Sequence, residues 1–587
     1  MRRRVARPSL ALVMLATLLP SLAAPGAMAQ EATATPTPPG SAEEQGSPAG
    51  PPVVLSLQDA LRGALENNLD IVVRSYDPLR SETRVIASES GFDPFLSASA
   101  RNAETDQRGV TSFTGVFIPF TSNAKSHLYN VHFEDPIITG GRYSVDLNGD
   151  DSDSAFQLGA NPPSSSQEFN TSYTVTFVQP LLRNLGASAT RSLIIVSRNT
   201  LGATEARFRQ TVIDTLATAE KAYWDLDFAH LNLKTRLAAL QLAKDFLDQN
   251  RIKVRVGTLA PIEITQAEAE VADREEAVII AQAAVRTAED AMRLIMNVPK
   301  TSPDWSRPIQ PSDMPAVVEI TPDMDAAVTS GMAHRPDLEA ARLDLKSRET
   351  DLAFRSNQKR WGLDFQGTYG NSGFDGSNYG NSIDDLRDRN QTDWTLRLNL
   401  LIPLRNRLAG ANYTDADYAL TQARYLVDSL EQLARIEVRN AVRTLETNLK
   451  RVKSAQVNVR LQREKLSAEQ KKFENGMSTS FQVLQFQTDL TTAEARENLA
   501  IVDYNKSQAE LQRVQGTLLE ARNMTMPGRD FQRKLSFPPE SGPGDQGGTD
   551  GATLFLGGQP TDSVRLPGDF VWNGRPLQAR EGRTPVR

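Results

Sequence analysis

The stretch Thr211–Leu247 reads TVIDTLATAEKAYWDLDFAHLNLKTRLAALQLAKDFL and contains neither proline nor glycine. Its apolar residues recur in alternating steps of four and three, at Val212, Leu216, Ala219, Tyr223, Leu226, Leu233, Leu237, Leu240 and Leu247. Only His230 and Lys244 interrupt this heptad seam, so the pattern predicts a helix that packs against other helices. Extended from Gly186 to Val256, such a helix has about 70 residues and is on the order of 100 Å long. No ordinary globular domain contains a helix of that length.

A second segment of the same kind runs from Leu408 to Glu474. Each long segment is followed, after a short break at Gly257 or Gly476, by a shorter helical run, which predicts two helical hairpins. Aligning the two glycines also aligns Gln266 with Gln485. Helical runs at 69–94 and 338–363 each lead into a strand. The chain is therefore predicted to be internally duplicated, each half having the order helix, strand, loop, strand, long helix, turn, helix.

The predicted strands alternate between apolar and polar residues. The polar positions in the second half are Asp364, Gln366, Arg397 and Asn399, and they lie between Leu363, Phe365, Leu396, Leu398 and Leu400. Tyr173, Val175 and Phe177 alternate with threonines in the first half. This pattern is typical of a transmembrane β-barrel with a polar lumen, and equally of an antiparallel sheet with one solvated face.

The beginning of the chain favours the barrel. Residues 1–29 have a basic start, an apolar run at Leu10–Leu19 and an A-x-A site at Ala27–Ala29, which predicts a secretory signal peptide. No later apolar run reaches the roughly 20 residues of a spanning helix. Residues 30–52 are predicted to be a disordered lead-in, and residues 523–587 a Pro/Gly-rich tail.

Composition excludes several function classes. The 587 residues include no cysteine and four histidines, so thiolate metal sites, cysteine nucleophiles and lipid anchors on cysteine are excluded. The net charge of -7 argues against nucleic acid as a partner. His127, His132, His230 and His334 are scattered, and no P-loop or G-x-S-x-G motif is present. We expect no enzyme activity, no metal and no cofactor.

These features together make the chain resemble the TolC-type outer membrane efflux proteins. The resemblance covers about Leu55 to Arg522. It rests on the duplicated order, the opening motif Leu55–Ala60 (LSLQDA), Asn68–Ile71 (NLDI), Arg335–Leu338 (RPDL), the two glycine turns, and prolines where strands meet long helices, Pro180 and Pro403.

The resemblance implies an α+β membrane protein. Three copies would form a 12-stranded barrel in the outer membrane, four strands each, continued by a coiled-coil tunnel in the periplasm. Residues 53–298 would form the first repeat, 299–322 an equatorial linker and 323–522 the second repeat. The implied function is a passive exit duct, joined by a periplasmic adaptor to an inner-membrane transporter, in a tripartite efflux pump or a type I secretion system.

The resemblance also implies where partners act. The adaptor would dock at the two turns, formed by Val256, Gly257, Thr258, Asn475, Gly476 and Met477. Family members carry two aspartates and an arginine at the aperture near the second turn, where this chain has Gln482, Gln485 and Ser478, while Glu263 follows the first turn. We therefore expect a constriction that attracts cations less strongly.

Two points stay open at this level. The loop between the first two strands is long, and residues 127–149 within it read as an extra hairpin, which we expect to be an extracellular extension rather than part of the barrel. The alternative function is a periplasmic coiled-coil adaptor or structural protein, which would also have a signal peptide and long hairpins.

Overall fold

The structure is a computed structural model that describes residues 50–389 and 391–527. The predicted signal peptide, most of the lead-in and most of the tail lie outside the described residues. In the part of the chain that is described, no helix combines the length and apolar character needed to cross a membrane.

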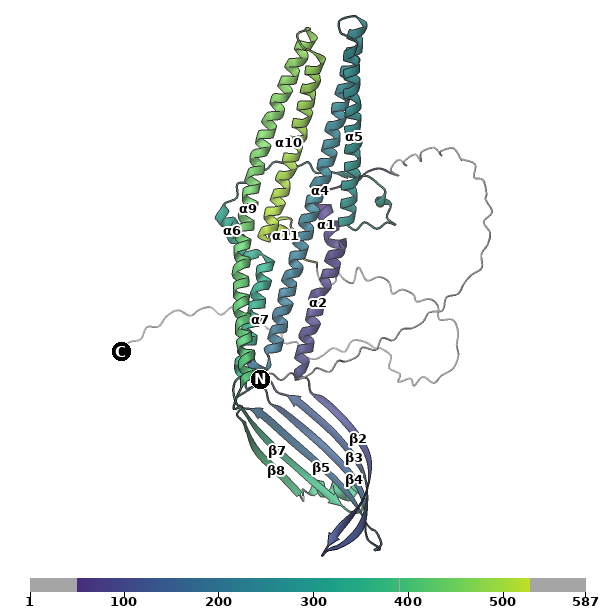
Figure 1. The fold of residues 1–587 in the computed structure, drawn as a ribbon, viewed down its shortest axis with the longest axis vertical. Helices are drawn as coiled ribbons and strands as arrows, with labels where there is room; N and C mark the ends of the chain where they lie inside the picture. Colours follow the sequence, from purple (N-terminus) through teal and green to yellow (C-terminus); the bar gives the residue numbers. More distant parts are fainter. Residues whose placement is uncertain (1–49, 390, 528–587) are drawn as a thin grey trace, which may run out of the picture. The chain divides into compact units, whose positions relative to one another are not determined.

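Long helices run side by side in one part of the molecule (Figure 1). The two longest are α4 (Ser192–Arg255, 64 residues) and α9 (Arg407–Glu474, 68 residues). Each forms a hairpin with the helix that follows it, α5 (Ile262–Ile295) and α10 (Ser480–Gln515). The helices α2 (Leu69–Glu89) and α7 (Pro336–Gln358) also pack on α4, and α7 packs on α9 as well.

Shorter elements complete the helical part. They are α1 (Leu57–Asn67), α3 (Ala187–Thr190), α6 (Met324–His334), α11 (Leu518–Ala521), and the 3-10 helices η1 (Ser90–Phe92) and η2 (Pro303–Trp305). Side chains fix several starts: Ser56, Asn68 and Asp323 accept hydrogen bonds from first-turn amides of α1, α2 and α6. The motifs LSLQDA, NLDI and RPDL lie at the starts of α1, α2 and α7.

The strands form one antiparallel sheet with the order β2-β3-β4-β5-β7-β8. Their bounds are β2 (Phe95–Phe113), β3 (Val116–Pro136), β4 (Arg142–Leu158), β5 (Ser164–Pro180), β7 (Gly362–Asp375) and β8 (Gln391–Leu401). The helix α8 (Tyr379–Asp388) connects β7 to β8 and packs on β7 and β5. A separate parallel pair joins β1 (Val53–Leu55) to β6 (Ile309–Pro311).

The sheet corrects two expectations. We expected four strands per chain, but the described residues place six in this sheet, because β2 and β3 pair without a break from Phe95↔Glu134 to Phe113↔Val116. The hairpin at 127–149 is not an extracellular extension, since it consists of parts of β3 and β4 within the sheet.

The turn of the hairpin at 127–149 lies at the end of the sheet that faces the helices. A Cβ on Gly140 would come within 2.3 Å of the backbone oxygen of Asn184, in the segment that leads to α3. The amide of Gly186 donates to the carbonyl of Thr139 at 3.0 Å. The turn of the hairpin is therefore fixed against the junction between sheet and helices.

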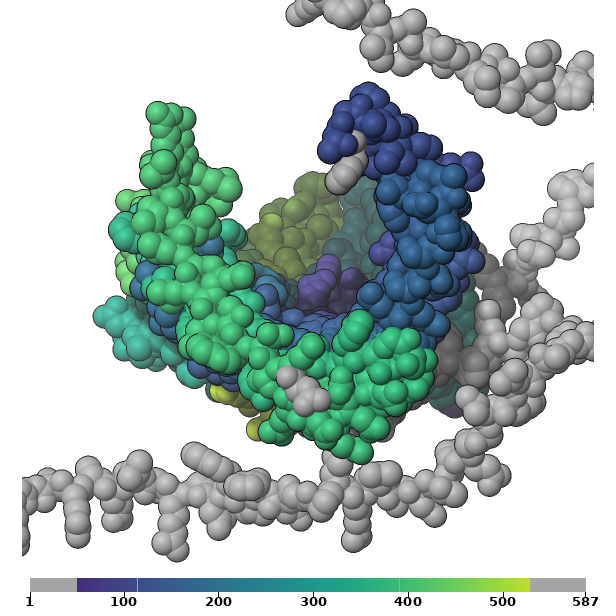
Figure 2. Space-filling model, turned by 90° about the horizontal axis from the view of Figure 1, so that it is seen from below, coloured from purple at the N-terminus to yellow at the C-terminus, as the bar shows by residue number. Residues whose placement is uncertain are grey.

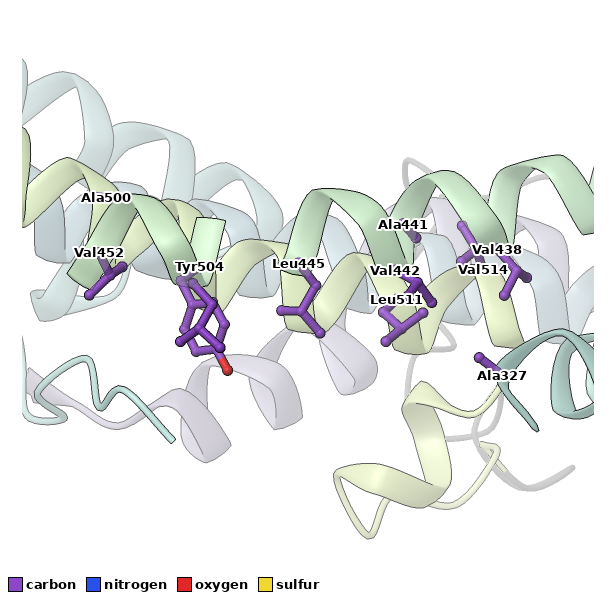
Figure 3. Close-up of a cluster of buried hydrophobic side chains, with 11 residues drawn as sticks. Ala327, Val438, Ala441, Val442, Leu445, Val452, Ala500, Tyr504, Leu511 and Val514 are labelled. Carbon is purple, nitrogen blue, oxygen red and sulfur yellow. The ribbon is translucent and has the colours of Figure 1, made fainter. Parts of the chain in front are cut away.

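The core between α9, α10 and α6 is a cluster of small and branched side chains around Tyr504 (Figure 3). The Tyr504 hydroxyl donates to the carbonyl of Val318 at 2.5 Å and accepts from the amide of Ile320 at 3.2 Å. On α4, the hydroxyl of Tyr223 bonds Asp313 at 2.9 Å. Two buried tyrosines from different hairpins thus hold the segment 299–322 against the helices.

Candidate functional site

The six strands present one polar and one apolar face. Residues directly opposite one another on antiparallel strands share a face, so Asp364 opposite Asn399 and Gln366 opposite Arg397 place the four predicted lumen residues together. On the neighbouring strands this face continues with serines, threonines and acidic residues such as Ser144, Asp146 and Thr176. The face can therefore hold water against the sheet.

The opposite face carries an apolar belt across all six strands. From β2 to β8 its members are Leu96, Ala98, Ala100, Tyr129, Val131, Phe133, Tyr143, Val145, Leu147, Tyr173, Val175, Phe177, Leu363, Phe365, Gly367, Tyr369, Trp394, Leu396, Leu398 and Leu400. These side chains are half-buried or exposed, Trp394 to 70%. On four of the six strands, the belt residue that lies farthest from the helices is aromatic, as at a membrane interface.

The predicted strand-end prolines lie at the junction with the helices. Pro180 is the last residue of β5, and Pro403 comes two residues after the end of β8. Sheet-like bonding continues briefly past Pro180, since the amide of Leu181 donates to the carbonyl of Leu363 at 2.6 Å. The amide of Asn184 then donates to the side chain of Asn357 at 2.7 Å and anchors the chain on α7.

The two glycine turns have the same backbone geometry. Gly257 has φ +83 and Gly476 has φ +73, the left-handed region that favours glycine. The amides of Thr258 and Met477 donate to the carbonyls of Lys253 and Lys472, at 2.9 and 2.8 Å. Each long helix therefore ends in a Schellman motif, which satisfies its last carbonyls and reverses the chain.

Both turns project apolar side chains into solvent. Val256 is 67% exposed and Met477 is 70% exposed, and Ile262 and Phe481 in the helices that follow are similarly open. Apart from the glycine itself and its two chain neighbours, no described atom lies within 4 Å of the position that a Cβ would take on either turn glycine. The hairpin tips thus offer backbone and apolar surface that nothing else in the described chain covers.

Below the tips, the two hairpins are joined to each other. The rings of Phe246 on α4 and Phe473 on α9 lie 5.3 Å apart, and the ammonium of Lys253 lies 3.8 Å from the centre of the Phe473 ring. The side chain of Asn250 donates to the hydroxyl of Ser480 at 3.3 Å. The two hairpins are therefore in direct side-chain contact below their tips.

Of the predicted aperture residues, Ser478 and Gln482 line one small groove beside the second turn. It has a volume of about 450 Å³ and is also lined by Met477, Glu469 and Lys472. Gln485 lies one turn further on and donates to Asp489 at 3.2 Å. Glu263 is not among the lining residues, because it lies in the first turn of α5 in the other hairpin.

The structure adds a charged group that the sequence did not single out. The hydroxyl of Ser478 donates to the carboxylate of Glu469 at 2.5 Å, and Lys472 donates to it at 3.1 Å. The hydrogen bond from Ser478 and then the hydrogen bond from Lys472 hold the pKa of Glu469 below its ordinary value. The only sequence signal was an acid three residues before a lysine at a helix end, a pattern that is common on solvated helices.

The structure is similar in fold to several solved outer-membrane channels. Against the outer-membrane channel OprN the identity is 16%, covering 78% of this chain and 90% of that chain, with a TM-score of 0.55. Against the Campylobacter jejuni CmeC outer membrane channel the identity is 14%, covering 82% of this chain and 88% of that chain, with a TM-score of 0.55. Against the outer membrane protein VceC of Vibrio cholerae the identity is 14%, covering 78% of this chain and 96% of that chain, with a TM-score of 0.55.

The search of curated proteins gave no match. A family described as "Outer membrane efflux protein" matches the sequence at residues 141–298 and 329–517, which together are more than half of the chain. The matched residues include the strands β4, β5, β7 and β8 and both long hairpins. On this match, the chain belongs to the outer membrane efflux protein family.

Proposed function

We propose that this chain is a passive exit duct, joined through a periplasmic adaptor to an inner-membrane transporter. Members of its family are efflux channels of the outer membrane rather than enzymes. The transporter is that of a tripartite efflux pump or of a type I secretion system, and the duct consists of three copies. The hairpin tips carry this proposal, because two exposed turns of equal geometry provide one kind of docking site twice.

Docking on these turns suits a partner helix. Close approach of a foreign helix requires a turn without a bulky side chain, which Gly257 and Gly476 provide. The flanking Val256 and Met477 supply apolar contacts, and Thr258 and Asn475 supply polar groups at the rim. This division into an apolar centre and a polar rim is typical of specific protein interfaces.

Crosslinking tests the docking site, since the chain has no cysteine of its own. Single substitutions Val256→Cys and Met477→Cys place a reactive thiol at each tip, and Tyr418→Cys, 69% exposed on α9 well before the turn, is the matched control. We expect both tip variants to capture, in intact cells, a protein with a helical hairpin flanked by compact β domains. Equal capture by Tyr418→Cys would refute tip docking.

We further propose that Asp364, Gln366, Arg397 and Asn399 line the lumen of a membrane barrel. Their common face supports this, as does the apolar belt opposite. A water-soluble thiol reagent should modify Gln366→Cys in assembled protein and leave the belt variant Leu398→Cys unmodified. The reverse pattern would mean that the two faces are assigned the wrong way round.

We propose that the narrowest point lies near Ser478, Gln482, Gln485 and Glu263. Gln482 and Gln485 would place amide groups where family members carry aspartates. The carboxylate of Glu469 already accepts hydrogen bonds from Ser478 and Lys472. Single-channel conductance should therefore be only weakly reduced by divalent or trivalent cations. Strong block at low cation concentration would contradict this assignment.

The chain is proposed to consist of two repeats, 53–298 and 323–522, around the linker 299–322. The paired elements support this, since α1 and α6 have 11 residues each, α4 and α9 have 64 and 68, and α5 and α10 have 34 and 36. Among the described residues, the first half contributes four strands to the sheet, β2 to β5, and the second half contributes two, β7 and β8.

A further inference from the structure

A groove lined mainly by arginines lies between α2 and α4. Arg74, Arg80 and Arg84 line it from α2, and Arg207 lines it from α4. Asp77 is the one acidic residue among the described residues that line it. The groove has a volume of about 370 Å³, a size typical of small-molecule sites in proteins. A concave site in which one sign of charge dominates raises the local concentration of ions of the opposite sign.

Two of the four arginines have no acidic partner. Arg80 and Arg84 are exposed and lie one helical turn apart. Within the described part of the chain, neither guanidinium group takes part in an ion pair or a side-chain hydrogen bond. Like charges at this spacing repel each other and destabilise a helix. A bound anion would offset that repulsion.

The other two arginines keep donors free for a ligand. Arg74 lies 3.6 Å from Asp77, and Arg207 pairs with Asp344 of α7 at 2.5 Å. A guanidinium group has five N–H donors, so one carboxylate contact does not use all of them. The side chains of Arg74 and Arg207 are 63% and 56% exposed. All four guanidinium groups can therefore be reached from solvent.

The floor of the groove is fixed by contacts between the two helices. The buried Ser81 donates a hydrogen bond from its hydroxyl to that of Thr204 at 3.2 Å, and Thr204 donates to the carbonyl of Thr200 at 2.8 Å. The half-buried ring of Phe208 lines the same groove. Because the two hydroxyl protons are used within the protein, the arginines are the groups that would bind an anion. The ring offers an apolar contact to the rest of the ligand.

The groove lies on the side of α4 that faces away from the linker. Thr204 and Thr211 line it one heptad apart, and so lie on one face of α4. Leu216 packs with residues of α1, and Tyr223 bonds Asp313 of the linker. At about 100° per residue, these two side chains point about 120 to 140° round the helix from Thr211.

The linker marks the outer side of the helices. It leads into α6, and α6 lies outside the hollow that the described part of the chain borders when it is viewed from the sheet end (Figure 2). The groove, on the other side of α4, therefore faces the hollow. With the three copies of the proposed function, three such grooves would surround one lumen.

We propose that this groove binds the anionic group of a substrate that passes through the duct. The substrate class is an organic anion, in which a carboxylate, phosphate or sulfonate is joined to an apolar or aromatic body. Guanidinium groups bind such oxyanions through two parallel N–H···O hydrogen bonds. The anion site rests on the groove alone, whereas the substrate role rests on the proposed function. The phosphate of an outer-membrane lipid has the same chemistry, so the test has to separate the two sources.

Equilibrium binding to full-length protein in detergent tests the site. The probe is naphthalene trisulfonate, a water-soluble aromatic anion, and the control probe is its uncharged trisulfonamide. We expect the sulfonate to bind more tightly, with an affinity that falls as salt is added. The double variant Arg80→Gln, Arg84→Gln should weaken its binding roughly tenfold, since two charged contacts are lost.

The matched control is Arg424→Gln, which removes an exposed arginine of α9 that does not line the groove. It should bind the sulfonate as the unaltered chain does. Equal affinity for the two probes would overturn the anion site, and so would equal weakening in the double variant and in Arg424→Gln.

Conductance in planar bilayers decides the source of the anion. Naphthalene trisulfonate should reduce the single-channel current, and the double variant should require a roughly tenfold higher concentration for the same reduction. Binding without any reduction of the current would overturn the substrate role in favour of a lipid phosphate, while the proposed duct would stand. Protein that binds the probe but carries no current would instead overturn the duct, while the anion site would stand.

Discussion

The hydroxyl of Ser478, two residues beyond the turn at Gly476, donates a 2.5 Å hydrogen bond to the carboxylate of Glu469 on α9. This bond stabilises the second hairpin turn, because it joins the segment after the turn to the last helical turns of α9 before it. Lys472 reaches the same carboxylate. A charge-assisted network therefore fixes the turn that we propose as a docking site.

The variant Ser478→Ala should raise the pKa of Glu469 toward its ordinary value and loosen the turn. A lowered carboxyl pKa stabilises the folded tip above the unfolded pKa, and this stabilisation is lost as pH falls through the folded pKa. We expect the amide of Met477 to exchange with solvent roughly tenfold faster, as one charge-assisted bond is lost. Ser478→Thr keeps the hydroxyl and is the control. Equal exchange in both variants would show that the bond does not restrain the turn.

Replacing the turn glycines should cost stability without any steric clash. Gly257 and Gly476 have positive φ, and no described atom lies near their Cβ positions, so alanine incurs only the backbone penalty of about 1 kcal/mol. The same change at Gly410, early in α9 and also with open space, should instead stabilise by up to about 1 kcal/mol. Denaturation followed by the circular dichroism of the helices measures the change in the free energy of unfolding for each variant. A change of the same sign at all three glycines would contradict the turn geometry.

Asp227 should make the helical part less stable as pH rises from about 4 to about 6. Burial, and then the charge of Asp313, raises the pKa of Asp227 to about 6. The folded state therefore binds this proton more tightly than the unfolded state. The shift corresponds to about 3 kcal/mol for the charged form at pH 7, which solvent screening at this incompletely buried site reduces to about 2 kcal/mol. Asp227→Asn should be more stable at pH 7 and should lose this pH dependence.

Trp224 is a suitable reporter, because its ring packs edge-on against Tyr223 at 5.4 Å beside Asp227. The control is Asp225→Asn, whose side chain is 57% exposed and pairs with Lys506. Unchanged pH dependence of unfolding in Asp227→Asn would show that the buried carboxyl is not its source.

Gly140→Ala should disrupt the junction between sheet and helices. Its Cβ would meet the backbone oxygen of Asn184 at 2.3 Å, which requires the β3–β4 turn or the segment before α3 to move. We expect loss of the heat-modifiable oligomer on gels, at a cost of about 3 kcal/mol or more for strain and overpacking combined. Gly115→Ala also has positive φ but no neighbour within 4 Å, so it should assemble. Normal assembly of both variants would mean that the junction tolerates this movement.

The long helices could be predicted because a heptad seam is a local signal. Val212, Leu216, Tyr223 and Leu226 are buried as the pattern indicates, but the seam does not continue unchanged. Leu237 is 46% exposed, whereas Ala239 and Ala243 are buried in its place. A straight helix of 3.6 residues per turn drifts away from a 3.5-residue repeat, so the buried stripe moves to other positions along a helix of this length.

The sequence by itself determined the two long hairpins, their glycine turns and the division of the strands into a polar and an apolar face. Each of these follows from the preferences and spacing of residues near one another in the chain. Only the tertiary structure decided that β2 and β3 join the sheet, that Gly140 lies against Asn184, and that Ser478 bonds Glu469. Strand pairing and side-chain contact depend on which backbone groups meet in space, and alternating residues do not specify that partner.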